Sequence, residues 1–212
     1  HAAWSDIARK IAHEVKNPLT PIKLAAERIE KKIIEKSIDF KDINNLTQTI
    51  SKQVDDIGKL VDEFSSFARM PKAEIKLDNL SKTLKESFNL FVNSHSNVNM
   101  KLLSKTKDIY FQFDRFQITQ AFNNIIKNSV EAVSNIPNPS ITLDLLENNN
   151  QIEFIVKDNG VGIDENKISK YFEPYFTTKD KGMGLGLSIV KKIIEDHGGL
   201  IKIEKNKNMA GT

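Results

Sequence analysis

Apolar residues return at alternating steps of four and three along the first part of the chain, and this spacing constrains the fold more than any other feature. The set is Ala8, Ala12, Val15, Leu19, Ile22, Ala26, Ile29 and Ile33. Such a spacing puts every member on one side of an α-helix, where it forms the seam of a packed rod. The pattern predicts one long helix from near Trp4 to about Glu35.

Two prolines, Pro18 and Pro21, fall inside this predicted helix. An interior proline removes a backbone hydrogen bond and crowds the preceding turn, so the helix either bends there or stops. A helix that ends before Pro18 is the simpler alternative. The apolar seam stays in phase through Ile33, however, which favours a single helix that bends just after His13.

A second seam follows the polar connection from Lys36 to Asp42. It again uses steps of three and four, and only Gln53 interrupts it: Ile43, Leu46, Ile50, Gln53, Ile57, Leu60, Phe64 and Phe67. Two helices joined by a short loop form a hairpin with an apolar face on each helix. We expect two copies to cover these faces as an antiparallel four-helix bundle, which makes the protein a homodimer. The alternative is that the hairpin packs on the rest of its own chain.

Pro71 ends the second helix, because the residue before a proline is pushed out of helical geometry. Beyond it, period-two patterns predict strands at 74–78, 98–102, 109–113, 141–146, 152–157 and 200–204, and helical patterns predict helices at 80–91, 115–133 and 187–196. Asp114 and Gln117 have the spacing of a capping box. The expected fold class is α+β: a helical hairpin at 1–70, a linker at 71–74 and a mixed domain at 75–212.

The overall composition excludes several classes of function. With 31 basic and 28 acidic residues the net charge is only +3, so no basic surface argues for nucleic-acid binding. Cysteine is absent, which excludes disulfides and thiolate metal sites and fits a reducing cytosol. No stretch has the roughly 18 to 20 apolar residues of a membrane span, and no signal peptide opens the chain. Because the first residue is His1, we expect a fragment, with any membrane anchor lying upstream.

His13 lies on the flank of the first seam, with Glu14 beside it and Asn17 one turn further along the same flank. An outward histidine on a helix is usually an ordinary surface residue. A neutral imidazole is nevertheless a fair nucleophile near neutral pH.

A glycine turn follows the predicted strand 152–157. It reads Asp158-Asn159-Gly160-Val161-Gly162. An aspartate at a strand end can accept a hydrogen bond from the exocyclic amine of adenine, and the two glycines permit close backbone approach to a ligand. The same letters also form ordinary turns. This stretch is therefore a candidate part of a nucleotide site.

A second glycine-rich stretch, 182–188, runs into the predicted helix 187–196 and contains Gly182, Gly184, Leu185 and Gly186. Backbone amides at such a helix start form an anion cradle for phosphates. The spacing matches neither a P-loop nor a Rossmann fingerprint. A flexible loop without a ligand is the alternative.

Asn124 and Asn128 lie one turn apart on the polar side of the predicted helix 115–133, with Lys127 beside them. A carboxamide oxygen together with nucleotide phosphates would suit Mg²⁺, although a solvated helix face has the same pattern. The segment 171–179 places aromatic residues close to Lys179. Those residues could clamp a loop over a nucleotide or simply pack it.

The order of these motifs resembles that of the two-component sensor histidine kinases, and the match covers essentially the whole chain. The shared motifs are His-Glu-x-x-Asn-Pro, the paired asparagines, Asp-x-Gly-x-Gly, the aromatic Phe-Glu-Pro-Tyr-Phe and Gly-x-Gly-Leu-Gly-Leu. Residues 3–24 look most like the nitrogen-regulation kinases of the NtrY type. The resemblance implies a dimerising hairpin followed by a Bergerat-type α/β sandwich, a fold shared with DNA gyrase B, Hsp90 and MutL ATPases.

The resemblance also implies roles for the residues of the first helix and the paired asparagines. His13 would accept a phosphoryl group from ATP, and Glu14 would be its acid/base partner. Asn17 would orient the water that dephosphorylates the partner regulator. Asn128 would coordinate Mg²⁺, with Asn124 nearby.

The remaining candidates would hold the nucleotide. Asp158 would bind the adenine amine, and Gly160 and Gly162 would shape that pocket. The ATP lid would contain Gly182, Gly184, Leu185 and Gly186, and Lys127 and Lys179 would offset phosphate charge. Family members usually continue into a final strand beyond Gly211 and Thr212.

The partners implied are a second copy of the chain and the receiver domain of an NtrX/NtrC-like response regulator, with no nucleic acid. The chain would be a cytoplasmic fragment of a protein anchored in a bacterial inner membrane. Whether ATP reaches the histidine of its own chain or of the partner depends on the handedness of the connection 36–42.

Two other functions fit part of the motifs. A GHKL-type ATPase of the chaperone or DNA-repair kind shares the nucleotide residues but leaves the His13 segment unexplained. A dimeric scaffold could bind nucleotide without catalysing any reaction.

Overall fold

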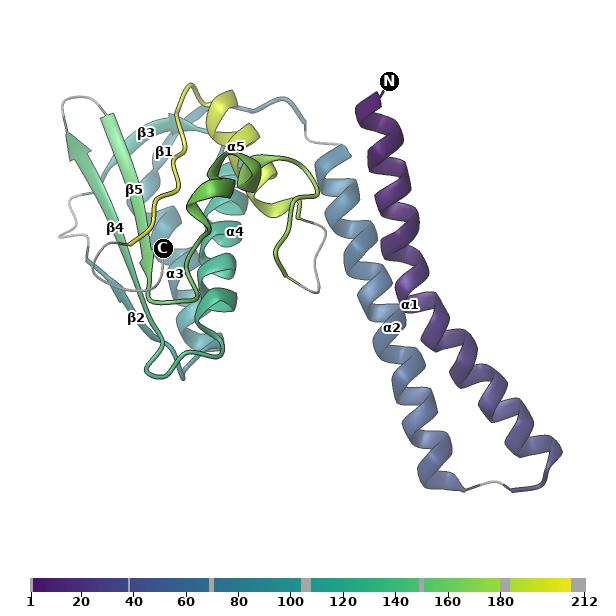
Figure 1. The fold of residues 1–212 in the computed structure, drawn as a ribbon. Helices are drawn as coiled ribbons and strands as arrows, with labels where there is room; N and C mark the ends of the chain where they lie inside the picture. Colours follow the sequence, from purple (N-terminus) through teal and green to yellow (C-terminus); the bar gives the residue numbers. More distant parts are fainter. Residues whose placement is uncertain are drawn as a thin grey trace. The chain divides into compact units, whose positions relative to one another are not determined.

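The computed structural model describes residues 2–37, 39–68, 71–103, 108–148, 151–179 and 184–206 (Figure 1). The chain divides into two compact units. One comprises His1–Met70 and Thr177–Leu185, and the other comprises Pro71–Phe176 and Gly186–Thr212. No helix within the described ranges is both long enough and apolar enough to cross a membrane.

Two long helices, α1 (Ala2–Ile34) and α2 (Phe40–Ala68), form the hairpin of the first unit. Helix α1 continues through Pro18 and Pro21, which confirms the prediction of a single helix. Helix α2 begins earlier than the predicted connection allowed, because Asp39 caps it by accepting the Lys41 backbone N–H at 3.0 Å.

The second unit begins with β1 (Lys76–Asn79), α3 (Leu80–Ser94), β2 (Asn99–Leu102), β3 (Tyr110–Phe113) and α4 (Arg115–Val133). It continues with β4 (Ser140–Asn148), β5 (Gln151–Asp158), the short 3₁₀ helix η1 (Glu165–Phe172) and α5 (Gly186–Asp196). Strands β1 and β3 pair antiparallel as a small sheet. In the larger sheet, β4 lies between β2, to which it is parallel, and β5, to which it is antiparallel.

The core of this unit lies between the larger sheet and a layer of helices. Helix α4 packs on β4 and β5 and is flanked by α3 and α5 (Figure 1). From the sheet, alternate residues of β4 are buried, and Phe154 meets Phe122 of α4 with ring centroids 4.5 Å apart. The buried face of α4 lies opposite Asn124 and Asn128: Ile118, Phe122, Ile126, Ser129, Val130 and Val133 are buried, and Ile125 is half-buried.

The predicted strand at 200–204 is wrong, since residues 200–206 form no strand. The period-two pattern itself is present, because Ile201 and Ile203 are less exposed than their neighbours. A strand also needs a ladder of backbone hydrogen bonds to a neighbouring strand. Within the described residues no such ladder joins 200–206 to the edge strand β5, although the Asn206 side chain donates to the Asp158 carbonyl oxygen at 3.5 Å.

The capping box predicted at the start of α4 is only half formed. Asp114 accepts the Gln117 backbone N–H at 3.0 Å, as an N-cap residue should. The reciprocal bond from the Gln117 side chain to the Asp114 backbone is replaced, because Gln117 Nε2 donates to the Pro71 carbonyl oxygen at 2.9 Å.

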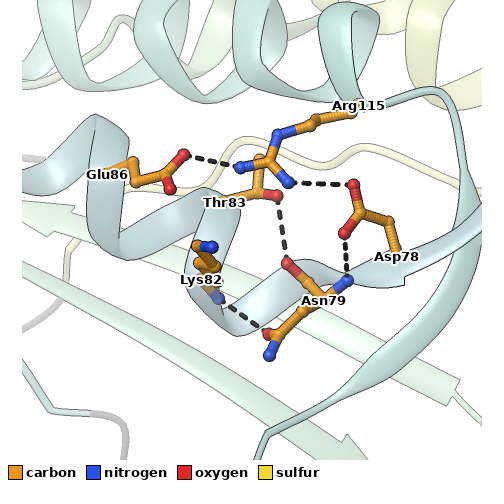
Figure 2. Close-up of polar contacts among 6 residues, drawn as sticks. All are labelled: Asp78, Asn79, Lys82, Thr83, Glu86 and Arg115. Atoms are coloured by element: carbon orange, nitrogen blue, oxygen red, sulfur yellow. Dashed lines mark hydrogen bonds and ion pairs between the residues drawn. The ribbon is translucent and has the colours of Figure 1, made fainter.

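A charged network joins β1, α3 and α4 (Figure 2). Arg115 donates through Nη1 to Asp78 at 2.9 Å and through Nη2 to Glu86 at 2.7 Å. Next to Asp78, Asn79 caps α3 by accepting the Lys82 backbone N–H at 2.9 Å. Because Arg115 and the backbone N–H of Asn79 both donate to the Asp78 carboxylate, the pKa of Asp78 is lowered.

Replacing Asp78 by asparagine is therefore expected to lower the free energy of unfolding at pH 7 and to matter less in acid. The contribution of the carboxylate is complete above a pH of about 4 and is lost as the pH falls through the lowered folded-state pKa. Urea unfolding of parent and variant at several pH values measures this difference. In an Arg115→Met background the substitution should have a smaller effect, and an equal effect there would show that the ion pair is not its cause.

Candidate functional site

The candidate phospho-acceptor segment lies on α1. The side chains of His13 and Asn17 are exposed, whereas Glu14 is half-buried and Pro18 is buried. Because proline lacks a backbone N–H, Pro18 and Pro21 cannot donate the helical hydrogen bonds to the carbonyls of Glu14 and Asn17. An accessible imidazole thus stands beside a carboxylate on a helix whose hydrogen-bond ladder is interrupted one turn later.

The asparagine pair of α4 faces the start of α5. A Cβ atom built on Gly186, the first residue of α5, would lie 3.7 Å from Asn124 Oδ1 and 3.7 Å from Asn128 Nδ2. Both asparagines are half-buried, and Lys127 between them is exposed. The first N–H groups of a helix have no partner within the helix. The structure therefore brings the carboxamides of Asn124 and Asn128 to the N-terminus of α5, and such groups suit phosphates and, through a carboxamide oxygen, a hard cation.

The Asp158 turn lies against the same helix, one turn further along. Asp158 ends β5, is 5% exposed, and accepts the Gly160 backbone N–H on Oδ1 at 2.9 Å. Gly160 approaches α4 so closely that a Cβ atom would lie 2.6 Å from the Ala132 carbonyl oxygen. The Val161 N–H donates to that same oxygen at 3.2 Å, and Gly162 has a φ of 72°. Asn128 and Ala132 are i and i+4, so the asparagine pair and the buried carboxylate follow one face of α4.

Two residues that hold this turn in place were not singled out in the sequence. Asn159 fixes the turn to the start of β4, because its Oδ1 accepts the Ser140 N–H at 2.8 Å and its Nδ2 donates to Asn138 O at 3.0 Å. Ala132 provides the backbone against which Gly160 packs. The letters Asp-Asn-Gly indicated a turn, but no sequence signal indicated which helix it would contact.

The aromatic segment before the lid packs within the second unit. The Tyr171 hydroxyl accepts the Asp164 N–H at 3.1 Å, and the Tyr171 and Phe176 rings meet edge to face at 5.4 Å. Tyr175 is buried, which raises the pKa of its phenol, and it has a φ of 66°. A tyrosine in the left-handed region is a strained backbone position held by its surroundings.

Of the predicted lid residues, Gly184 and Leu185 belong to the first compact unit, as does Lys179, whereas Gly186 is the first residue of the second stretch of the second unit. The Lys179 N–H donates to Thr177 Oγ1 at 3.1 Å, and Gly184 has a φ of 67°. Gly182 lies outside the described residues. No group of three or more histidine, aspartate or glutamate residues able to hold a metal occurs in the part of the chain that the structure describes.

Comparison with known families gives two matches that follow each other along the chain. Residues 3–72 match the His Kinase A (phospho-acceptor) domain, and residues 113–212 match the Histidine kinase-, DNA gyrase B-, and HSP90-like ATPase family. The first match includes His13, and the second includes the asparagine pair, the Asp158 turn and Gly186.

Among curated proteins, Nitrogen regulation protein NtrY of Azorhizobium caulinodans is 40% identical over 95% of this chain and 27% of its own length. A Putative sensor histidine kinase NtrY-like of Rickettsia felis is 37% identical over 95% of this chain and 34% of its own length. The chain thus spans about a third, or less, of these relatives.

Two solved structures support the same assignment. The catalytic domain of histidine kinase ThkA is 33% identical, with a TM-score of 0.59, over 64% of this chain and 90% of that one. Histidine kinase ThkA in complex with response regulator protein TrrA covers 96% of this chain and 58% of that one, with a TM-score of 0.76 and 26% identity. The hairpin and the mixed domain confirm the predicted α+β fold class, and the chain belongs to the sensor histidine kinases.

Proposed function

We propose that this chain is the kinase core of a sensor histidine kinase, which transfers the γ-phosphoryl group of ATP to His13 and then to an aspartate of a response-regulator receiver domain. One observation carries this proposal. An exposed His13 next to Glu14 lies in a region that matches phospho-acceptor domains, and a buried Asp158 and an asparagine pair lie in a region that matches ATPases.

Nucleotide binding falls to the α4 face that Asp158, Gly160 and the asparagine pair share. Asp158 accepts a hydrogen bond from the adenine amine, and Gly160 and Gly162 leave room for the base. Asn128 holds Mg²⁺, with Asn124 nearby, and the ion offsets phosphate charge when bound. The N-terminus of α5 and Lys127 face the phosphates. Lys179, Gly182, Gly184, Leu185 and Gly186 form the lid.

At His13 the reaction is an in-line displacement. Glu14 holds the proton of one ring nitrogen, so that the lone pair of the other nitrogen is available for attack. A nitrogen–phosphorus bond forms, the bond between the β- and γ-phosphates breaks, and ADP leaves. The protein contributes positioning and charge stabilisation. In the reverse direction of signalling, Asn17 orients the water that attacks the phosphoryl-aspartate of the regulator.

The test separates three classes of protein. Incubation with Mg²⁺ and γ-labelled ATP should leave label on the chain that is labile to acid and stable to alkali, as a phosphohistidine is. Release of labelled phosphate without labelled protein would instead indicate an ATPase, and bound nucleotide with neither outcome would indicate a scaffold.

Transfer of the label to receiver domains completes the assay. Asn17→Ala should keep autophosphorylation while slowing dephosphorylation of the regulator.

Replacing Glu14 by glutamine is expected to slow autophosphorylation by about 100-fold, which is the lower range for loss of a general acid or base. The dissociation constant for ATP should stay the same, because Glu14 lies on α1, whereas Asp158 and the asparagine pair lie in the second unit. Glu27→Gln is the matched control, since Glu27 lies on the same helix in an exposed ion pair with Lys23. A large loss of ATP affinity in Glu14→Gln would contradict the role.

A second copy of the chain covers the exposed apolar face of the hairpin. One hairpin leaves an apolar groove of about 350 Å³ lined by Ala26, Ile29, Glu30, Ile33, Ile34 and Ile50. Leu24 and Ile33 remain 54% and 55% exposed. An apolar face of this kind is covered when two hairpins form a four-helix bundle. Sedimentation equilibrium should give twice the mass of the chain, and a monomer at micromolar concentration would refute the pairing.

The likeness to NtrY proteins supports three further parts of the proposal. The whole protein is anchored in a bacterial inner membrane, its kinase core faces the cytoplasm, and its regulator is NtrX/NtrC-like. Transfer of phosphoryl groups to such a receiver domain, in competition with unrelated receivers, tests the choice of partner.

A further inference from the structure

The segment that opens the second unit is fastened to α4 by two hydrogen bonds. We call residues 71–75 the lead-in segment. Gln117 Nε2 donates to the Pro71 carbonyl at 2.9 Å, and the Glu74 N–H donates to Asp114 Oδ2 at 2.8 Å. Burial raises the pKa of Asp114, but the N–H groups of Gln117 and Glu74 more than offset this and lower it. The carboxylate is thus ionised at neutral pH and accepts both bonds.

Gln117 is placed as an anchor rather than as part of a helix cap. Its side chain is 1% exposed, and within the described residues its Oε1 atom is buried without a hydrogen-bond partner. Leaving a buried acceptor unsatisfied costs free energy. The same side chain in a complete capping box would bond to the Asp114 backbone. The Gln117 side chain instead donates its hydrogen bond to the Pro71 carbonyl oxygen of the lead-in segment.

Because the capping box is only half formed, the Asp114 backbone N–H does not bond to the Gln117 side chain. It bonds instead to the residue that follows α5. It donates to His197 Nε2 at 2.9 Å, while His197 Nδ1 lies 2.7 Å from the Ile193 carbonyl oxygen. Because a carbonyl only accepts, Nδ1 carries the proton, and Nε2 is left with the lone pair that Asp114 needs. His197 therefore joins the C-terminal end of α5 to the N-terminal end of α4.

The opposite end of this helix pair carries the nucleotide residues. Gly186 at the start of α5 lies against Asn124 and Asn128 on α4. Helices α4 and α5 thus meet at both ends: one contact borders the proposed nucleotide site, and the other holds the lead-in segment. A shift of α5 against α4 at the first contact has to be accommodated at the second, where Asp114 connects His197 with Glu74.

We propose that Gln117 and His197 are positioning residues for the phosphoryl-transfer step rather than for nucleotide binding. Gln117 holds the lead-in segment directly, and His197 holds it through Asp114. Together they fix this segment to the two helices of the nucleotide site. This inference rests on the proposed function. Phosphoryl transfer depends on alignment, and a misplacement of about 1 Å can lower a rate about 100-fold. The lead-in segment is where the chain passes from the unit of His13 to the unit of Asp158, so its fixation bears directly on that alignment.

Matched substitutions separate positioning from folding. Gln117→Met keeps the length of the side chain and removes both the anchoring donor and the unsatisfied oxygen, so stability should be retained. His197→Gln can place its amide oxygen where Nε2 accepts, whereas His197→Asn reaches only the position of Nδ1. His197→Gln should therefore rescue the function that His197→Asn loses.

The experiment measures the ATP dissociation constant, the autophosphorylation rate at saturating ATP and the thermal midpoint for the full chain. We expect Gln117→Met and His197→Asn to lose about tenfold or more in rate, with dissociation constants within about twofold of the parent and His197→Gln close to the parent. Unchanged rates in both variants, or rates that fall only in step with affinity or thermal midpoint, would overturn the inference. A parent that binds ATP but takes no label would overturn the proposed function as well.

Discussion

Replacing Asp158 by asparagine is expected to weaken ATP binding by about 10- to 100-fold, the value of a hydrogen bond to a charged acceptor in a buried site. Asp158 is 5% exposed at the end of β5, so its carboxylate would be a buried acceptor for the adenine amine. Asparagine keeps an oxygen for the Gly160 N–H, which Asp158 Oδ1 accepts at 2.9 Å, so the turn should survive. Calorimetric titration with ATP measures the loss.

Asp144→Asn is the control for this substitution, because Asp144 lies on β4 of the same sheet, away from the glycine turn. Its affinity for ATP should equal that of the parent. If Asp158→Asn binds ATP as tightly as the parent does, the carboxylate does not hold the base, and the pocket is assigned to the wrong turn.

Replacing Gly160 by alanine is expected to disturb both stability and nucleotide binding. The added Cβ would lie 2.6 Å from the Ala132 carbonyl oxygen and 2.7 Å from the carbonyl carbon, which are backbone atoms of a packed helix. The turn has to move away from α4, at a cost of about 1 to 3 kcal/mol for overpacking. Because the turn carries Asp158, ATP affinity should fall together with the free energy of unfolding.

Gly58→Ala is the control in the same chain, and its expected effect on stability is opposite in sign. A Cβ at Gly58 meets nothing within 4 Å, and the residue lies inside α2. Removing a glycine from a helix interior stabilises the helix by about 1 kcal/mol. Urea unfolding should therefore show the two alanine variants moving in opposite directions. A Gly160→Ala variant as stable as the parent would mean that the turn does not pack on Ala132.

The elements with long, regular patterns were predictable from the sequence. Helix α4 occupies the predicted range, since a strong cap at Asp114 and a continuous buried face define it. Helix α1 extends across both prolines as its unbroken seam indicated. Here local chemistry and tertiary packing favour the same structure, so the pattern is a sufficient guide.

The failures have physical causes that no local pattern contains. Residues 200–206 alternate like a strand but form no backbone ladder with the edge strand β5. The 3₁₀ helix η1 was missed, because it is only eight residues long and its apolar side consists of just Ile168, Tyr171 and Phe172, all half-buried. Gln117 was expected to complete a capping box, whereas a contact with Pro71, 46 residues away in sequence, takes its side chain.

The candidate site likewise contains residues that the sequence indicated and residues that it did not. Asp158, Gly160, the asparagine pair and Gly186 were identified by residue type and spacing, and the structure brings them to one face of α4. The partners that hold them, Ala132 and Asn159, depend on contacts between distant segments. Sequence reasoning therefore proposed the candidate groups but not the residues that hold them in place.

The central claim is that ATP phosphorylates His13 and no other residue. After incubation with Mg²⁺ and γ-labelled ATP, peptide mapping under alkaline conditions should place all acid-labile label on the α1 peptide that contains His13. His13→Gln should abolish the label without loss of ATP binding, whereas His95→Gln, a change in the second unit, should leave it intact. Label on any other residue, or none from a parent chain that demonstrably binds ATP, would contradict the account.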